Sequence, residues 1–289
     1  MDRRMRPFHT LALSAVLLAA LAAPVAAGYP GGFRVMSYNI RVDVPSDDPA
    51  WPERRPHMAR QIAFLDPDIL GVQEAQTHMV EWLASQLPAY ERYGLGRDDG
   101  QTGESATVFW KRDRFERLQA DTFWCSPTPE VPSREWDAAY PRTVTRVVLR
   151  DRRGGEVLDV RNTHFDHVGV VAREQCARLV AAMPPVEVDG AEVRVVLMGD
   201  FNTGPGTRPY EILVGAGLAD ARTVSPVVFG PAGSFNDFDI ASDNDGVAID
   251  HIFIGPGLAV ERFGVPTDSF GGRVISDHFP LVADLTPGS

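Results

Sequence analysis

The sequence has little cysteine, no excess of basic charge and only one long apolar run. Its 28 Lys and Arg are outnumbered by 39 Asp and Glu, which gives a formal charge of −11. The chain as a whole therefore offers no global attraction for nucleic acid or anionic lipid. The single apolar run lies at the extreme N-terminus, which excludes a protein with several membrane-spanning helices.

What is present is the composition of a folded domain. Hydrophobic residues make up 44% of the 289 positions, enough for a sizeable core and too many for a chain that is disordered throughout. The 26 glycines and 23 prolines follow no fixed repeat, which excludes collagen and favours a fold rich in loops. Because no internal repeat or low-complexity linker is visible, we expect residues 28–289 to form one domain.

Residues 1–27 have the pattern of a secretory signal peptide. Three arginines precede the apolar stretch 11–23, and small residues lead to Ala27. The stretch is short for a membrane span, which needs about 20 residues. We therefore expect cleavage after Ala27 and a secreted or periplasmic protein with no membrane span in its mature form. An uncleaved anchor is the alternative.

The two cysteines are expected to be unpaired. Export would place Cys125 and Cys176 in an oxidising compartment, where they could form a disulfide. Cys176, however, lies in the helix-like run 173–179, where a small buried thiol is equally natural. We favour the two free thiols over the pair.

Short apolar runs alternate with amphipathic segments along the rest of the chain. Strands are predicted at 33–40, 69–73, 106–110, 143–149, 157–163, 193–198, 249–254 and 280–285. Helices are predicted at 54–65, 79–87, 170–183 and 208–214. Several of these strands end abruptly in polar residues, at 37–41, 71–74, 162–167 and 199–202. Strand ends at one edge of a sheet bring distant residues together, so we expect these side chains to share one site.

The residue types at these strand ends suit a metal-dependent phosphoesterase. Carboxylate and amide oxygens are hard ligands that favour Mg²⁺, Mn²⁺ or Ca²⁺, whereas zinc would require several His or Cys. A metal ion neutralises phosphate charge while a histidine moves a proton to or from the reacting oxygen. The sequence has no G-x-S-x-G, Walker or G-x-G-x-x-G motif, so acyl transfer and nucleotide-dependent chemistry lack support.

Six short motifs, in order, resemble the endonuclease/exonuclease/phosphatase superfamily. They are Met36-Ser37-Tyr38-Asn39, Gln73-Glu74, Asn162-Thr163-His164, Gly199-Asp200-Phe201-Asn202, Ile249-Asp250-His251-Ile252 and Ser276-Asp277-His278-Phe279-Pro280-Leu281. The resemblance covers about 33–285. It implies an α+β fold, a four-layer α/β/β/α sandwich of two mixed β-sheets flanked by helices, with the site at one end of the sandwich.

The resemblance also implies roles for individual residues. It assigns metal binding to Asn39, Glu74 and Asp277. It assigns catalytic roles to Asp200 and Asn202, which would orient water and phosphate or hold a second metal. The pair of His278 with Asp250 and a second histidine, His164, would also be catalytic. Glu104 would support His164. It assigns phosphate contacts to Arg97 and Arg142. Arg41 departs from the apurinic endonucleases, which have an Asp at that position, so a metal ligand is missing there.

Other polar residues near these motifs have simpler interpretations. Asp166 and His167 are expected to support a loop rather than to react, and His251 is expected at the surface or in packing. Asp250 lies within an apolar strand, where an unpaired carboxylate is costly, so it needs a partner such as His278.

We therefore expect an exported, Mg²⁺-dependent phosphoesterase that works without a covalent intermediate, with Mn²⁺ or Ca²⁺ as possible substitutes. Its substrate could be nucleic acid, a phospholipid headgroup or a small phosphoester, and no stable protein partner is predicted. The segment 224–229 is the nearest match to a membrane-docking hairpin, and it is short. The rival hypothesis is a binding module that kept the fold and lost the chemistry.

Overall fold

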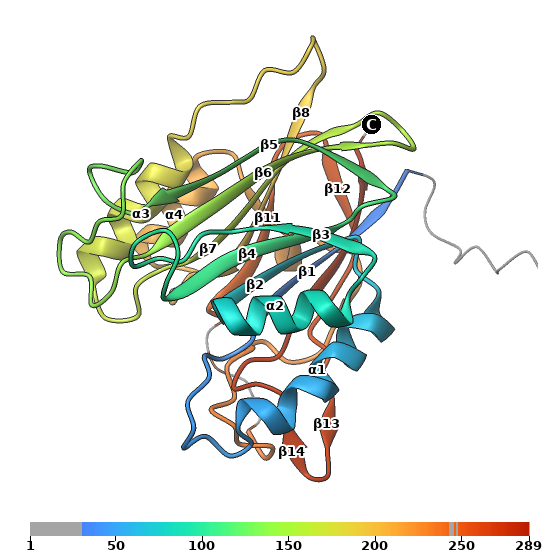
Figure 1. The fold of residues 1–289 in the computed structure, drawn as a ribbon. Helices are drawn as coiled ribbons and strands as arrows, with labels where there is room; N and C mark the ends of the chain where they lie inside the picture. Colours follow the sequence, from blue (N-terminus) through green and yellow to red (C-terminus); the bar gives the residue numbers. More distant parts are fainter. Residues whose placement is uncertain (1–30, 243–245, 247, 289) are drawn as a thin grey trace, which may run out of the picture.

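Two β-sheets lie face to face in the computed structural model, with helices on their outer sides (Figure 1). The structure describes residues 31–242, 246 and 248–288. The predicted signal peptide, 1–27, lies outside the described residues.

Each sheet mixes parallel and antiparallel strands. The first has the order β10 (Val228–Phe229), β12 (Leu258–Gly264), β15 (Leu281–Pro287), β1 (Phe33–Asn39), β2 (Ile69–Gln76), β4 (Glu104–Lys111) and β3 (Tyr90–Tyr93). The second has the order β5 (Phe115–Trp124), β6 (Thr143–Asp151), β7 (Val157–His164), β8 (Val193–Asp200), β11 (Asp250–Ile254) and β9 (Ala219–Asp220). A separate hairpin joins β13 (Ser269–Phe270) to β14 (Arg273–Val274). The pairs β1–β2 and β7–β8 are parallel, so within each sheet two strands end at the same edge.

The helices cover the outer faces of the two sheets. They are α1 (Trp51–Leu65), α2 (Thr77–Gln86), α3 (Val170–Ala181), α4 (Arg208–Gly215) and the short α5 (Ala221–Val224). Three apolar clusters separate the layers: one between the sheets, one under α1 and α2, and one under α3 and α4. The predicted four-layer sandwich is therefore confirmed. No helix in the described part of the chain is long and apolar enough to cross a membrane.

Strand β1 shows why the central strands read as continuous apolar runs. Val35 packs in the cluster between the sheets, whereas Met36 and Tyr38 pack under α1 and α2. Successive side chains of a strand point to opposite faces, so a strand buried on both faces carries apolar residues at nearly every position.

The prediction of two free cysteines is wrong. Cys125, just after β5, and Cys176, in α3, form a disulfide with a Cα–Cα distance of 4.9 Å. The helical pattern around Cys176 correctly predicted a buried position, but it carries no information on how near Cys125 lies, 51 residues away. The disulfide ties the end of β5 to α3, and the backbone N–H of Cys125 also donates to the carbonyl of Arg142 at 2.7 Å.

Candidate active site

The strand-end residues meet at one end of the sandwich. Asn39 ends β1 and Glu74 lies near the end of β2, while His164 and Asp200 end the neighbouring strands β7 and β8 in register with each other. Asp250 begins β11 directly opposite Asp200. Parallel strands in both sheets thus deliver these side chains to a common edge.

Buried polar contacts fix the two sheets together just below this edge. Asn162 on β7 donates from Nδ2 to the carbonyls of Val72 (2.9 Å) and Thr107 (3.0 Å) in the other sheet. Its Oδ1 accepts from Gln73 Nε2 at 2.7 Å. A fully buried amide with all these bonds holds the sheets at a fixed spacing, so the residues above keep their separation.

A glycine lets β7 and β8 approach closely beside the site. Gly199, with φ of 149°, directly precedes Asp200, and a Cβ there would lie 2.0 Å from the carbonyl oxygen of Thr163. Any other residue would push the two strands apart at the point where they present His164 and Asp200.

Glu74 is aimed into the site by an irregularity in β2. The register of β2 with β4 shifts between Val72 and Ala75, and Glu74 has a φ of 60°. Its carboxylate accepts from Asn39 Nδ2 at 2.9 Å and from the backbone N–H of Val42 at 2.9 Å. A left-handed non-glycine residue costs roughly 1–3 kcal/mol, and such residues concentrate at functional sites.

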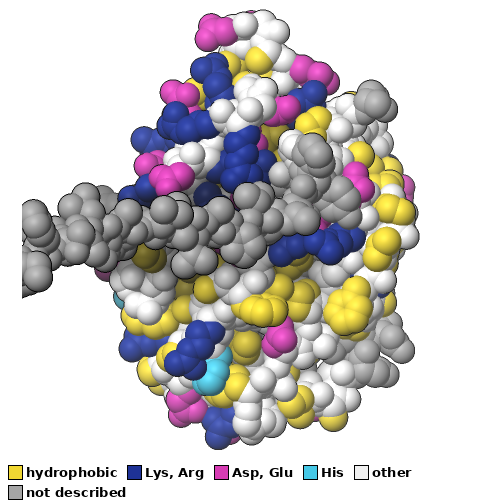
Figure 2. All heavy atoms as spheres, turned by 90° about the vertical axis from the view of Figure 1, so that its right-hand side faces the viewer, with side chains coloured by type: hydrophobic (Ala, Val, Ile, Leu, Met, Phe, Trp, Pro, Cys, Tyr) yellow, Lys and Arg dark blue, Asp and Glu magenta, His cyan; other side chains and the backbone are white. Residues whose placement is uncertain are grey.

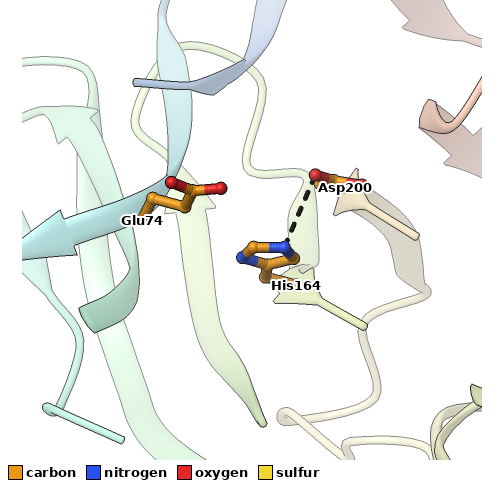
Figure 3. Close-up of side chains that lie close together, drawn as sticks. All are labelled: Glu74, His164 and Asp200. Atoms are coloured by element: carbon orange, nitrogen blue, oxygen red, sulfur yellow. Dashed lines mark ion pairs between the residues drawn. The ribbon is translucent and has the colours of Figure 1, made fainter. Parts of the chain in front are cut away.

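Glu74, His164 and Asp200 surround a point where a cation could bind (Figure 3). One ligand atom from each lies within 4.8 Å of the others, and His164 Nε2 is 3.5 Å from Asp200 Oδ2. Asn39 links the two carboxylates, because its Nδ2 donates to Glu74 Oε1 (2.9 Å) and to Asp200 Oδ2 (3.0 Å). In this arrangement Asn39 contributes its amide nitrogen, and its predicted role as a metal ligand stays a prediction.

The positive charges near Asp200 and Asp277 do not fully offset the burial of these carboxylates. Burial, and after it the charge of Asp250, raises the pKa of Asp200 to about 7. Burial raises the pKa of Asp277 to about 6, although Arg41 Nη1 lies 3.5 Å from its Oδ2. A divalent cation would supply the missing charge, and carboxylate and amide oxygens are the donors that Mg²⁺ and Ca²⁺ prefer. The residues present therefore fit a hard divalent metal ion.

His278 and Asp250 form a buried pair beside this cluster. The distance from His278 Nδ1 to Asp250 Oδ2 is 2.8 Å, and the hydroxyl of Ser234 donates to the same oxygen. Burial lowers the pKa of His278, but the charge and hydrogen bond of Asp250 outweigh it and raise this pKa well above the usual value. His278 Nε2 faces Asp200 Oδ2 at 3.8 Å.

His164 has the opposite protonation tendency. Burial, followed by the charges of Arg142 and Arg97, lowers the pKa of His164 well below its usual value. The site therefore holds one imidazole that favours the neutral form, His164, and one that favours the cationic form, His278. A neutral imidazole can accept a proton, and a cationic one can donate it.

Asn202 braces the loop that follows β8. It adopts a φ of 48°, its N–H donates to Asp200 Oδ1 at 2.9 Å, and its Nδ2 donates to the carbonyl of Phe165 at 3.0 Å. Short polar residues such as Asn tolerate this left-handed conformation. In the structure Asn202 thus orients the carboxylate of Asp200.

Two buried arginines form the side of the site next to His164. Arg97 and Arg142 line a small cavity together with Glu74 and His164. Nη1 of Arg142 and Nε of Arg97 are buried and have no hydrogen-bond partner. Buried donors without a partner are costly, so this cavity is suited to an anion.

The predicted pair of Glu104 with His164 is not formed in the structure. Glu104 lines the same cavity, but its Oε2 accepts from Arg97 Nη1 at 2.6 Å. A permanently charged guanidinium gains more from a carboxylate than a histidine that stays neutral, which accounts for the exchange of partners. Glu104 therefore positions Arg97.

Asp166 was expected to support a loop, and in the structure its carboxylate holds the loop that carries Arg142. Its carboxylate accepts from the N–H groups of Ala139, Tyr140, Val168 and Gly169 and from Arg142 Nε. These N–H donors outweigh burial and lower the pKa of Asp166. His167 Nδ1 lies 3.0 Å from Arg142 Nη2.

The residues that form this site lie within a segment that matches a known protein family. A model of the Endonuclease/Exonuclease/phosphatase family matches residues 36–278, which includes five of the six motifs in full and the sixth as far as His278. The chain belongs to this family. Members of the family hydrolyse phosphoesters and generally depend on a divalent metal ion.

Two solved structures of this family from Bacteroides thetaiotaomicron are similar over nearly the whole domain. One, described only as a family protein, is 34% identical, with 89% of this chain and 98% of that chain covered and a TM-score of 0.85. The other, a mannosyl-6-phosphatase, is 34% identical, with coverage of 88% and 99% and a TM-score of 0.84.

A curated relative from Arabidopsis thaliana, carbon catabolite repressor protein 4 homolog 2, is 25% identical over 226 residues. That match covers 64% of this chain but only 37% of the relative's length.

Several residues of this family site were not predicted from the motifs. Ser234 supports Asp250, and Tyr140 lies over Arg97 and Arg142, with its ring centroid 4.7 Å and 5.9 Å from their guanidinium carbons. His251 was expected either at the surface or in packing; it is buried and packed, and its Nδ1 pairs with Asp220. Ser234 and Tyr140 lie in loops, where no hydrophobic periodicity marks a side chain as belonging to a site.

Proposed function

We propose that this chain is a metal-dependent phosphomonoesterase that acts on a small phosphorylated alcohol, with a sugar phosphate as the leading substrate class. The observation that carries this proposal is the pair of arginines that line the cavity beside His164, because Arg142 Nη1 and Arg97 Nε are buried and have no hydrogen-bond partner. The non-bridging oxygens of a phosphate would accept from these donors while the carboxylate side of the site holds the cation.

The size of the cavity favours a monoester over a diester. Its volume is about 10 Å³, room for one water-sized group. The two arginines that line it are only 9% and 5% exposed. A single phosphate oxygen fits such a small space, whereas the ester arm of a diester is too large for it.

The similarity to a mannosyl-6-phosphatase supports the same substrate class. That protein is 34% identical to this chain, and the match covers 88% of this chain and 99% of that protein's chain. The composition offers less support for a nuclease, because 39 Asp and Glu outnumber 28 Lys and Arg and give the chain no global attraction for a nucleic-acid strand. On the face shown in Figure 2, at the opposite end of β1 from Asn39, the described Lys and Arg side chains are interspersed with Asp and Glu.

Mg²⁺ is the metal we propose, with Mn²⁺ or Ca²⁺ as substitutes. The family resemblance gives Asn39, Glu74 and Asp277 as the residues that would hold it. Glu74 and Asp200 lie in one cluster of possible ligands, and Asn39 Nδ2 joins their carboxylates. When bound, the ion would neutralise phosphate charge and so favour attack by water.

The two imidazoles then divide the proton transfers. His164, whose pKa is lowered, would accept a proton from the attacking water, and Asp200 at 3.5 Å from its Nε2 would orient that water. His278, whose pKa is raised, would donate a proton to the leaving oxygen and be stabilised by Asp250. Arg97 and Arg142 would hold the phosphoryl group throughout.

Export remains part of the proposal. We take residues 1–27 as a signal peptide and 28–289 as a single catalytic domain, secreted or periplasmic. The disulfide between Cys125 and Cys176 supports this location, because disulfides persist mainly in oxidising compartments.

The proposal is tested by comparing matched monoester and diester substrates. Purified protein should hydrolyse p-nitrophenyl phosphate and mannose 6-phosphate with Mg²⁺, and EDTA should abolish the activity. We expect kcat/KM for the monoester to exceed that for bis-p-nitrophenyl phosphate by about a hundredfold or more, a difference of about 2.7 kcal/mol in transition-state stabilisation. Faster cleavage of the diester or of DNA would overturn the assignment.

A phospholipid headgroup is the second candidate. Val224, Val227, Val228 and Phe229, in and before β10, are 49%, 56%, 44% and 68% exposed. Exposed apolar side chains in one segment are typical of a surface that meets a membrane. Phosphatidic acid in vesicles, offered against free glycerol 3-phosphate, distinguishes the two: a clear preference for the vesicle substrate would favour the lipid.

A further inference from the structure

One aromatic side chain lies against the two arginines of the phosphate cavity and has no part in the chemistry described so far. Tyr140 is 48% exposed although it lies beside two of the most buried arginines of the molecule. Arg97 lies over its ring, 4.7 Å from the centroid, and Arg142 lies 5.9 Å away. The ring therefore lies against both arginines that line the cavity, and about half of it is exposed.

The backbone of Tyr140 is fixed, and its ring is held by Arg97 and by stacking on the His167 ring, with ring centroids 5.9 Å apart. Its N–H donates to Asp166 Oδ2 at 3.2 Å, and the same oxygen receives Arg142 Nε at 3.3 Å. The disulfide restrains the same loop, because Cys125 donates to the carbonyl of Arg142. An aromatic ring that is both rigid and half-exposed offers a preformed surface for stacking.

The geometry points to Tyr140 as a specificity-determining residue that stacks against the sugar ring of the substrate. This inference rests on the proposed phosphomonoesterase function. A phosphate seated against Arg97 and Arg142 would direct its ester carbon away from the buried part of the cavity, toward the half-exposed ring beside these arginines. The C–H face of a pyranose carried on that carbon packs on an aromatic ring, as ligand rings do in pockets lined by aromatic side chains. An acyclic alcohol has no such face to offer.

Tyr140 has one competing role that the experiment must separate. Its ring could act only by holding Arg97 in place through the cation–π contact. In that case every phosphate ester would lose affinity equally when the ring is removed, because all of them use Arg97. Stacking on the sugar predicts a loss that depends on the substrate.

The test compares a pyranose substrate with an acyclic one. Mannose 6-phosphate and glycerol 3-phosphate are assayed with the wild type, Tyr140→Ala, Tyr140→Leu and Tyr140→Phe. We expect the Ala and Leu variants to raise KM for mannose 6-phosphate about three- to tenfold with kcat nearly unchanged. For glycerol 3-phosphate, KM should change by less than about twofold. Tyr140→Phe should restore wild-type values, because stacking needs the ring and not the hydroxyl.

Phe64→Ala is the matched control, since Phe64 is an exposed aromatic, 88% accessible, near the end of α1. It should leave both substrates unaffected. An equal rise in KM for both substrates in Tyr140→Ala, or no change for either, would overturn the stacking role. If the wild type hydrolyses neither monoester, the phosphomonoesterase assignment itself fails, and this result is distinct from a Tyr140 effect.

Discussion

Two buried His–Asp pairs lie side by side in this molecule, and only one of them faces the site. In His278–Asp250 and in His251–Asp220 the distance from Nδ1 to Oδ2 is 2.8 Å. Asp250 and His251 are consecutive on β11, so their side chains point to opposite faces of the sheet. One pair opens toward Asp200, and the other is packed among Phe201, Tyr210 and Phe253.

The second ring nitrogen makes the difference between them. His251 Nε2 lies 3.0 Å from the carbonyl of Thr203, and Asp220 also accepts from the hydroxyl of Tyr210. Both nitrogens of His251 are thus used by the fold. His278 Nε2 faces Asp200 at 3.8 Å, too far for a hydrogen bond, and is left for a substrate. A His–Asp contact is therefore no sign of catalysis by itself; a free second nitrogen is the informative feature.

The largest expected effect is on turnover. His278→Asn should lower kcat about 10²- to 10⁴-fold, because a general acid contributes that much to a proton transfer. His251→Asn should change kcat by less than about tenfold, since its ring contacts the fold and not the substrate. Steady-state kinetics on p-nitrophenyl phosphate, with circular dichroism as the check on folding, measure both. Equal losses in the two variants would remove the distinction.

The free energy of unfolding should fall more in His251→Asn than in His278→Asn, the reverse of the order expected for kcat. His251→Asn breaks a pair in which both side chains are at most 3% exposed, and such a loss costs about 3–5 kcal/mol. Urea denaturation gives the free energy of unfolding, and Asp220→Asn is the partner variant. The double variant His251→Asn with Asp220→Asn should cost less than the two single losses together. A loss below about 1 kcal/mol would mean that the pair is not a structural support.

Asp200 lies between the imidazoles of His164 and His278, and its ionisation should make the stability of the metal-free protein depend on pH. Burial raises its pKa to about 7, whereas in the unfolded chain it ionises near about pH 4. Between these values only the folded state keeps the proton, so the stability contributed by this group falls as the pH rises. In EDTA, Asp200→Asn should therefore gain stability relative to the wild type from about pH 5 to about pH 8. A constant offset between the two proteins would contradict this prediction.

The sequence predicted the central strands and the four long helices because burial shapes their patterns. The run 157–163 became β7 (Val157–His164), and 208–214 became α4 (Arg208–Gly215). Strand β5 (Phe115–Trp124) was missed, because as an edge strand it exposes Arg117 and Gln119 and lacks a continuous apolar run. Its periodicity is diluted by residues that face water.

The site was predictable where polar residues interrupt buried strands, and not where loops supply the side chains. Asp200 and His164 stand at the ends of apolar runs, which marks them in one sequence. The position of Tyr140 depends on where its loop is held by Asp166 and by the disulfide. Those contacts join residues far apart in the chain, and no local pattern records them.

The smallest expected effect comes from removing the hydroxyl group that donates a hydrogen bond to Asp250 or to Asp220. Ser234 donates to Asp250, and Tyr210 donates to Asp220 at 3.2 Å, so the two hydroxyls hold equivalent places. Removing the first in Ser234→Ala should let Asp250 reorient and lower kcat about two- to tenfold, the value of one hydrogen bond. Tyr210→Phe should leave kcat unchanged and lower the melting temperature instead. The control Ser234→Thr keeps the hydroxyl donor and should retain wild-type kcat. If Ser234→Ala has the kcat of the wild type while Tyr210→Phe has a lower kcat, the roles assigned to the two His–Asp pairs are reversed.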